Sequence, residues 1–157
     1  MKILRATESN LTSVVSMGEC LQEELRKYEP NLVFDFKKSL KHYRDELKNQ
    51  DALIIVAINS EDVLMGYQYS YITKLEYLIN SKKECVFEAI YVNSFSRGKG
   101  VGKALMRYSE KWAIDEKKVD RIKANIYFGN LESESLHVRN GFKPYCTEYI
   151  KLINSND

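Results

Sequence analysis

The stretch from residue 85 to residue 103 constrains this chain most, because an apolar run leads directly into three alternating glycines. Residues 85–92 (CVFEAIYV) are rich in β-branched and aromatic side chains, which is typical of a buried strand. Gly98, Gly100 and Gly102 follow, and the residues after them repeat apolar side chains at helical spacing. A strand, a glycine turn and a helix in this order present backbone N–H groups to an anion, above all a phosphate.

Two common phosphate motifs are excluded by single positions. A Walker A loop needs glycine where this chain has Arg97, and serine or threonine where it has Ala104. The dinucleotide motif G-x-G-x-x-G would place its third glycine at Lys103 or Leu105. The turn therefore belongs to neither class of nucleotide site.

Composition and charge limit the classes of protein to which this chain can belong. The chain has 157 residues, of which 44% are hydrophobic and 29% charged, so we expect one globular domain over residues 1–157. A net charge of +2 argues against nucleic acid or an anionic membrane as partner. The three cysteines are widely spaced and form no zinc or other metal motif, and Cys85 reads as a core residue rather than a catalytic thiol. The N-terminus lacks the apolar run of a signal peptide, and we expect a cytoplasmic protein.

The remaining pattern predicts a mixed α/β fold in the order β-α-α-β-β-β-α-β-α-β. The predicted strands are residues 2–6, 52–58, 63–72, 85–92, 121–128 and 145–153. The predicted helices begin after Ser9 or Asn10, after Asp35, near Val101 and after Asn130. Gly66, inside a strand, predicts a bulge or a close backbone approach, and Gly141 predicts a left-handed helix cap.

Three segments together resemble one family. Residues 97–102 read R-x-x-G-x-G, residues 90–92 (IYV) stand five to seven positions earlier, and residues 130–142 resemble N-x-x-A-x-x-L-Y-x-x-x-G-F. This combination is similar to the GNAT superfamily of acetyl-CoA-dependent N-acetyltransferases. The resemblance implies a central sheet that splays beside the apolar strand, flanked by helices, with acetyl-CoA as acetyl donor and no metal.

The resemblance also implies which residues bind the donor. The main chain of the strand end would hydrogen-bond the pantetheine arm, the glycine turn would hold the pyrophosphate, and the next helix cap would contact the arm. The implied residues are Ile90, Tyr91, Val92, Arg97, Gly98, Lys99, Gly100, Val101, Gly102, Lys103 and Asn130.

Glu88 is the predicted general base, because it is the only charged residue within residues 85–92. By simple alternation it would share a face with Val86, Ile90 and Val92. A structural salt bridge or an anchor for the substrate ammonium group is an alternative role. Glu84, four residues earlier, is the second candidate for the base.

His137 is the predicted general acid. It stands seven residues after Asn130, where the family usually has tyrosine, and seven residues are about two helical turns. A histidine in that place could protonate the leaving thiolate or donate a hydrogen bond to it. The alternative is a surface or half-buried histidine, with the thiolate leaving unaided.

The predicted function is transfer of an acetyl group to a primary amine of a small molecule or a protein by direct attack. A catalytically weak acyl-CoA sensor is the alternative. The acceptor site should lie among the first two helices, residues 73–83 and the last strand, with Tyr28, Tyr43, Tyr69, Tyr71 and Tyr145 as candidate lining residues. A homodimer is possible through residues 67–71 or the last strand.

Overall fold

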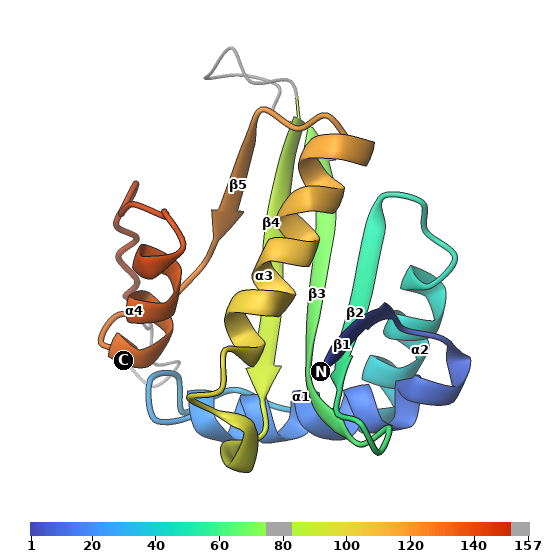
Figure 1. Cartoon of the computed structure of the whole chain (residues 1–157). Coiled ribbons are helices and arrows are strands. Elements are labelled where there is room, and N and C mark those ends of the chain that lie inside the picture. Colours follow the sequence, from blue (N-terminus) through green and yellow to red (C-terminus); the bar gives the residue numbers. More distant parts are fainter. Residues whose placement is uncertain (75–82, 152–157) are drawn as a thin grey trace.

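The computed structural model describes residues 1–74 and 83–151, and it contains a five-stranded sheet with helices on both faces (Figure 1). The strands are β1 (Lys2–Arg5), β2 (Ala52–Ile58), β3 (Leu64–Lys74), β4 (Lys83–Val92) and β5 (Arg121–Ala124). The helices are α1 (Leu11–Leu25), α2 (Phe36–Glu46), α3 (Val101–Lys111) and α4 (Leu131–Arg139), with short helical turns at Glu8–Asn10, Ser94–Ser96 and Trp112–Glu116. The strands lie in chain order; β1 to β4 are antiparallel, and β5 is parallel to β4. The predicted mixed α/β fold is confirmed.

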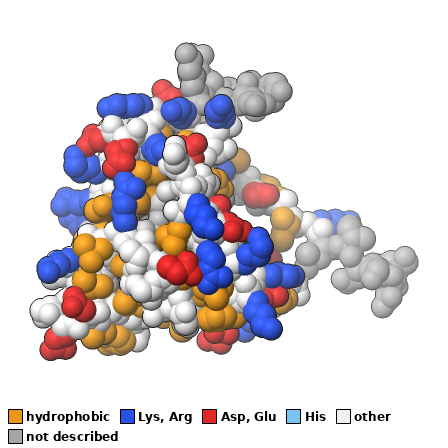
Figure 2. Space-filling view, turned by 90° about the vertical axis from the view of Figure 1, so that its right-hand side faces the viewer, with side chains coloured by type: hydrophobic (Ala, Val, Ile, Leu, Met, Phe, Trp, Pro, Cys, Tyr) orange, Lys and Arg blue, Asp and Glu red, His pale blue; other side chains and the backbone are white. Residues whose placement is uncertain are grey.

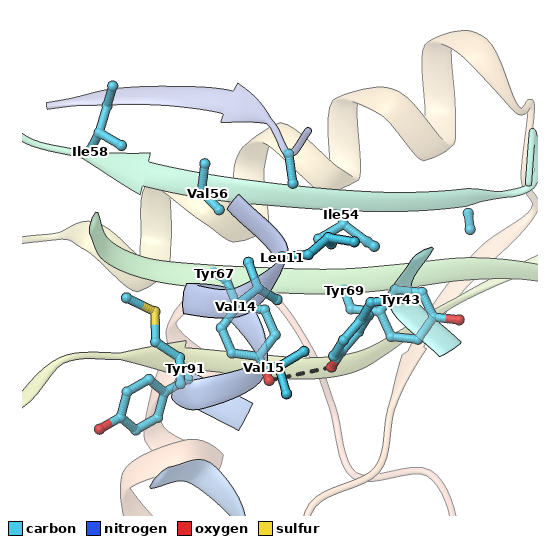
Figure 3. Packing of buried hydrophobic residues seen from close by; sticks show 13 residues of the cluster. Leu11, Val14, Val15, Tyr43, Ile54, Val56, Ile58, Tyr67, Tyr69 and Tyr91 are labelled. Atoms are coloured by element: carbon cyan, nitrogen blue, oxygen red, sulfur yellow. Dashed lines mark hydrogen bonds between the residues drawn. The ribbon is translucent and has the colours of Figure 1, made fainter. Parts of the chain in front are cut away.

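The sheet separates two apolar clusters, one under α1 and α2 and the other under α3. All seven residues of β2 are buried, because this strand packs against both layers and its apolar run needs no polar alternation. Leu11, Val14 and Val15 of α1 point toward Ile54 and the other apolar side chains of the sheet (Figure 3). No helix of the described residues is long and apolar enough to cross a membrane.

Three predicted helix caps are confirmed, whereas Asn10, at the start of α1, makes no side-chain cap hydrogen bond. The Asp35 carboxylate accepts from the Lys38 N–H at 3.0 Å at the start of α2, and the Asn130 side chain accepts from the Ser133 N–H at 3.2 Å at the start of α4. Gly141 ends α4 with φ of 89°, and the next N–H, from Phe142, donates to the His137 carbonyl at 3.1 Å. This is the left-handed termination that the glycine predicted.

Gly66 brings two backbones into close contact, as predicted. A Cβ atom on Gly66 would lie 2.4 Å from the Tyr91 carbonyl oxygen, a distance at which the backbones must separate. The register between β2 and β3 also skips a residue beside it, since Ala57 pairs with Gly66 and Ile58 with Leu64. Gly66 therefore fixes the end of β4 tightly against β3.

β4 contains a bulge at Glu88, which changes the face of the sheet on which the following side chains lie. Tyr69 pairs with Ala89 and Ser70 with Phe87, so that Glu88 is the extra residue. Before the bulge the odd-numbered Phe87 packs under α3, whereas after it the even-numbered Ile90 does. The predicted shared face of Glu88 with Ile90 and Val92 is therefore wrong, because alternation restarts at the bulge.

The sheet splays directly after this point. β5 pairs with β4 only from Glu84 to Phe87, and beyond Ala124 the two strands separate. β5 is accordingly shorter than the predicted 121–128. The predicted last strand is also not formed over residues 145–151, where every side chain is exposed and finds no face to bury; residues 152 and 153 lie outside the described part.

Two further expectations concern surfaces. Tyr67 and Tyr69 are buried in the central strand β3, and residues 67–71 are paired with β2 on one edge and with β4 on the other. Of the predicted acceptor loop 73–83, residues 75–82 lie outside the described residues.

On the side that carries α2, basic and acidic side chains are interspersed (Figure 2), and Lys41 and Arg44 pair with Asp45 and Glu8 at 2.7 Å each.

Candidate active site

A cavity of about 1700 Å³ opens where β4 and β5 diverge. Its walls are the second half of β4, the first turn of α3, the inner side of α1, the segment after β5 and α4. Side chains of α2 and β3 and of residues 146–150 also line it. Within the described residues, one edge of β4 has no strand partner from Glu88 to Val92, so that its backbone groups on that edge face the cavity side. An extended, amide-bearing molecule could pair with this edge as an additional strand would.

The glycine turn forms one end of the cavity. Gly98 and Gly100 have φ of 72° and 79°, a left-handed conformation that favours glycine, and a Cβ on either would meet no atom within 4 Å. Gly100 is also the N-cap of α3, whose first N–H groups have no partner inside the helix. Bare backbone, open space and a helix N-terminus thus coincide, which suits a phosphate group.

Gly102, unlike Gly98 and Gly100, is a close packing contact rather than an open position. A Cβ there would lie 3.3 Å from Cδ2 of Leu136 and 3.8 Å from Cγ2 of Val92. The missing side chain lets α4 pack against the first turn of α3. This contact positions α4 as a wall of the cavity.

The Arg97 guanidinium braces the turn against its neighbours. Nε donates to the Val92 carbonyl at 3.0 Å, and Nη2 donates to both Glu24 carboxylate oxygens at 2.6 and 2.8 Å. The Glu132 carboxylate of α4 lies 3.7 Å from Nη1. Arg97 therefore ties the end of β4 to α1 and α4 while it lines the cavity.

The other residues predicted to bind the donor divide into two groups. Ile90, Tyr91, Val92, Gly98, Gly100, Val101, Gly102, Lys103 and Asn130 line the cavity together. Lys99 is exposed and does not line it. Asn130 combines this place with its role as the cap of α4.

Glu88 lies on the same cavity wall, where the bulge turns it toward α2. Its side chain is exposed, and no described residue forms an ion pair with it. The alternative of a structural salt bridge therefore finds no partner in the described part of the chain. An open carboxylate beside the unpaired β4 edge is the geometry that a base needs.

Glu84 has the opposite surroundings. It is 2% exposed and pairs with the Arg121 Nε–H of β5. It lines neither the cavity nor the smaller hollow described below. The pair joins the paired halves of β4 and β5, which is a structural role.

His137 is buried away from the cavity. Its Nδ1 lies 2.7 Å from the Ser133 carbonyl oxygen, so Nδ1 carries the proton and donates. The ring packs edge-on against Phe142 with 5.1 Å between centroids, and burial lowers the pKa of the imidazole, against the opposing effect of that hydrogen bond. The geometry gives no support to the predicted general acid, because a buried neutral ring with its Nδ1 proton committed is poorly placed to protonate a thiolate.

A second hollow, of about 320 Å³, adjoins the cavity on the α2 side. It is lined by His42, Glu46, Asn49, Tyr69, Tyr71, Ile72 and Glu88. The Tyr69 hydroxyl donates to Glu46 at 2.9 Å, and burial, this bond and the Glu88 charge hold the pKa of Tyr69 above its ordinary value. Glu46 and His42 were not predicted, although their spacing of four residues on a helix places them on one face.

The remaining candidates are accounted for by their surroundings. Tyr28, Tyr43 and Tyr69 line the cavity and Tyr71 the second hollow, whereas Tyr145 lines neither and stacks under Arg121 at 5.3 Å. Cys85 is fully buried, and burial raises the pKa of its thiol to about 12, so it is a core residue.

Comparisons with known proteins find the same fold in solved structures. Solved structures with the same fold include a mutant BH1408 protein from Bacillus halodurans (TM-score 0.81, 16% identity, 98% of this chain and 100% of that chain). They also include an aminoglycoside 6′-N-acetyltransferase from Acinetobacter haemolyticus (TM-score 0.76, 21% identity, 98% and 100% covered). A third is another aminoglycoside 6′-N-acetyltransferase, in complex with a bisubstrate analogue that contains coenzyme A (TM-score 0.74, 18% identity, 99% and 98% covered).

At these identities the likeness concerns the fold alone. No curated protein matches the chain by sequence. The model of the acetyltransferase (GNAT) family, however, matches residues 18–142, which include the second half of α1, the β4 bulge, the glycine turn and α4. The chain therefore belongs to the GNAT acetyltransferase family.

Proposed function

We propose that the protein transfers the acetyl group of acetyl-CoA to a primary amine by direct attack. The observation that carries this proposal is the continuity of the cavity, which runs from Glu88, along the unpaired β4 edge, to the glycine turn and the N-terminus of α3. A thioester donor with an amide-bearing arm and a pyrophosphate fits these features in that order.

The residues would act as follows. The β4 edge from Ile90 to Val92 aligns the amide-bearing arm, and backbone N–H groups of Gly98 to Lys103 hold the phosphates. A backbone N–H beside the bulge donates to the carbonyl oxygen on which negative charge develops. Glu88 accepts a proton from the attacking ammonium group, directly or through a water molecule.

The reaction balances without a metal or a redox step. The amine nitrogen forms a bond to the acetyl carbon, and the carbon–sulfur bond breaks. The ammonium group loses two protons in all: one is released to solvent through Glu88, and one ends on the thiolate. In this proposal the thiolate is protonated by water rather than by His137, because His137 is buried away from the cavity.

The second candidate, an acyl-CoA sensor with weak catalysis, is favoured by one observation, namely the position of His137. Release of free thiol from acetyl-CoA in the presence of an amine panel distinguishes the two. Turnover with at least one amine supports the enzyme. Thermal stabilisation by acetyl-CoA with no thiol release for any amine supports the sensor, and no stabilisation at all contradicts both.

A further inference from the structure

We propose that the second hollow binds a second ammonium group of the acceptor, so that the acceptor is a diamine or a longer polyamine. This inference rests on the proposed function and names its substrate class. One amine would react beside Glu88, while another cationic nitrogen on the same molecule would be held beside Glu46.

The first observation is continuity. His42, Tyr69 and Glu88 line both the main cavity and the second hollow, so the hollow extends the cavity past the carboxylate at which the amine would react. A linear acceptor with one end at Glu88 would therefore place its other end in the second hollow. A short monoamine would leave that space to water.

The second observation is a fixed carboxylate with one oxygen left over. Tyr69 Oη–H and Asn49 Nδ2–H both donate to Oε2 of Glu46, at 2.9 and 3.2 Å. Within the described residues, Oε1 of Glu46 accepts no hydrogen bond. The carboxylate is thus held in place by neutral donors, and its second oxygen remains available to a cationic N–H.

The third observation is the nature of the walls. Tyr69 and Tyr71 present two rings with centroids 5.9 Å apart, and His42 packs edge-on against Tyr69 at 5.5 Å. Tyr69 is itself supported by Tyr43 of α2 (Figure 3). Aromatic faces attract ammonium groups, and no lysine or arginine among the described residues lines this hollow.

The opposite end of the main cavity carries basic side chains near the glycine turn and α4. Lys103 and Arg139 line it, together with Arg97, which is paired with Glu24. A phosphate-bearing donor and a dicationic acceptor would therefore approach from opposite ends and meet at Glu88. An acceptor with a carboxylate in place of the second amine would be repelled by Glu46 and Glu88.

The test compares three acceptors of similar length: 1,4-diaminobutane, n-butylamine and 4-aminobutanoate. Initial rates of thiol release from acetyl-CoA should give a kcat/KM for the diamine at least tenfold above that for butylamine, well beyond the factor of two from its two equivalent amines. 4-Aminobutanoate should fall below butylamine. Glu46→Gln should reduce the preference for the diamine to about threefold or less, mainly through KM.

Asp45→Asn is the matched control, since Asp45 neighbours Glu46 but pairs with Lys41 on the exposed side of α2. This variant should keep the diamine preference. Equal kcat/KM for diamine and monoamine would overturn the inference while leaving the proposed function intact. If no amine is acetylated, the proposed function fails, and calorimetry of 1,4-diaminobutane with the intact protein decides the inference. Binding that Glu46→Gln abolishes supports the subsite, and absence of binding overturns it.

Discussion

Glu84 and Glu88 stand four residues apart on one strand, yet the fold gives them opposite roles. Glu84 lies where β4 is paired on both edges; it is buried and pairs with Arg121. Glu88 lies at the bulge where β5 departs, and its carboxylate is open to the cavity. The comparison teaches that the end of one strand pairing separates a structural carboxylate from a chemically available one.

The sharpest test of this difference is Glu88→Gln. If Glu88 is the base, kcat should fall about 100-fold or more, because an amide cannot accept the proton. The melting temperature should change little, since Glu88 is exposed. Steady-state thiol release and thermal denaturation measure the two effects, and unchanged turnover would remove Glu88 from the mechanism.

Glu84→Gln should show the reverse pattern. The substitution leaves Arg121 without its partner in a half-buried place, which should reduce the free energy of unfolding by about 2 kcal/mol. Turnover per folded molecule should stay within about threefold, as Glu84 lies outside the cavity. Denaturant unfolding and active-site-normalised kinetics test both statements, and a 100-fold loss of kcat would reverse the two assignments.

The glycine turn permits a matched pair of smaller changes. Gly100 and Gly141 both have positive φ and open space at Cβ, but only Gly100 lines the cavity. Alanine at either position should cost about 1 kcal/mol of stability from backbone strain. Only Gly100→Ala should also weaken acetyl-CoA binding, measured by calorimetry. Equal affinity in the two variants would contradict phosphate binding at the turn.

The smallest expected effect concerns His137. Burial lowers its pKa below 6.5, so at mildly acidic pH the unfolded chain binds more protons than the folded one. The free energy of unfolding should therefore decrease as the pH falls below about 6.5. In His137→Gln this contribution should be absent, so the difference between the two pH profiles measures it. A profile of turnover that follows the His137 titration at constant stability would instead restore it as the acid.

Much of the fold was readable from local pattern. The glycine turn, the caps Asp35 and Asn130 and the close approach at Gly66 follow from backbone preferences that act over a few residues. The prediction of a last strand is wrong over residues 145–151, because strand formation needs a partner edge, which local preference does not supply.

The sequence by itself determined the family, the glycine turn and the order of elements as far as α4, since these depend on residue types at fixed spacing. Only the tertiary structure decided the chemistry around the turn. Strand alternation predicted one face for Glu88, Ile90 and Val92, and a bulge set by pairing with β3 moved Glu88 to the other. Helical spacing placed His137 beside Asn130, but packing against Phe142 buried its ring. Residue spacing describes a single element, whereas access to a cavity depends on how several elements pack together.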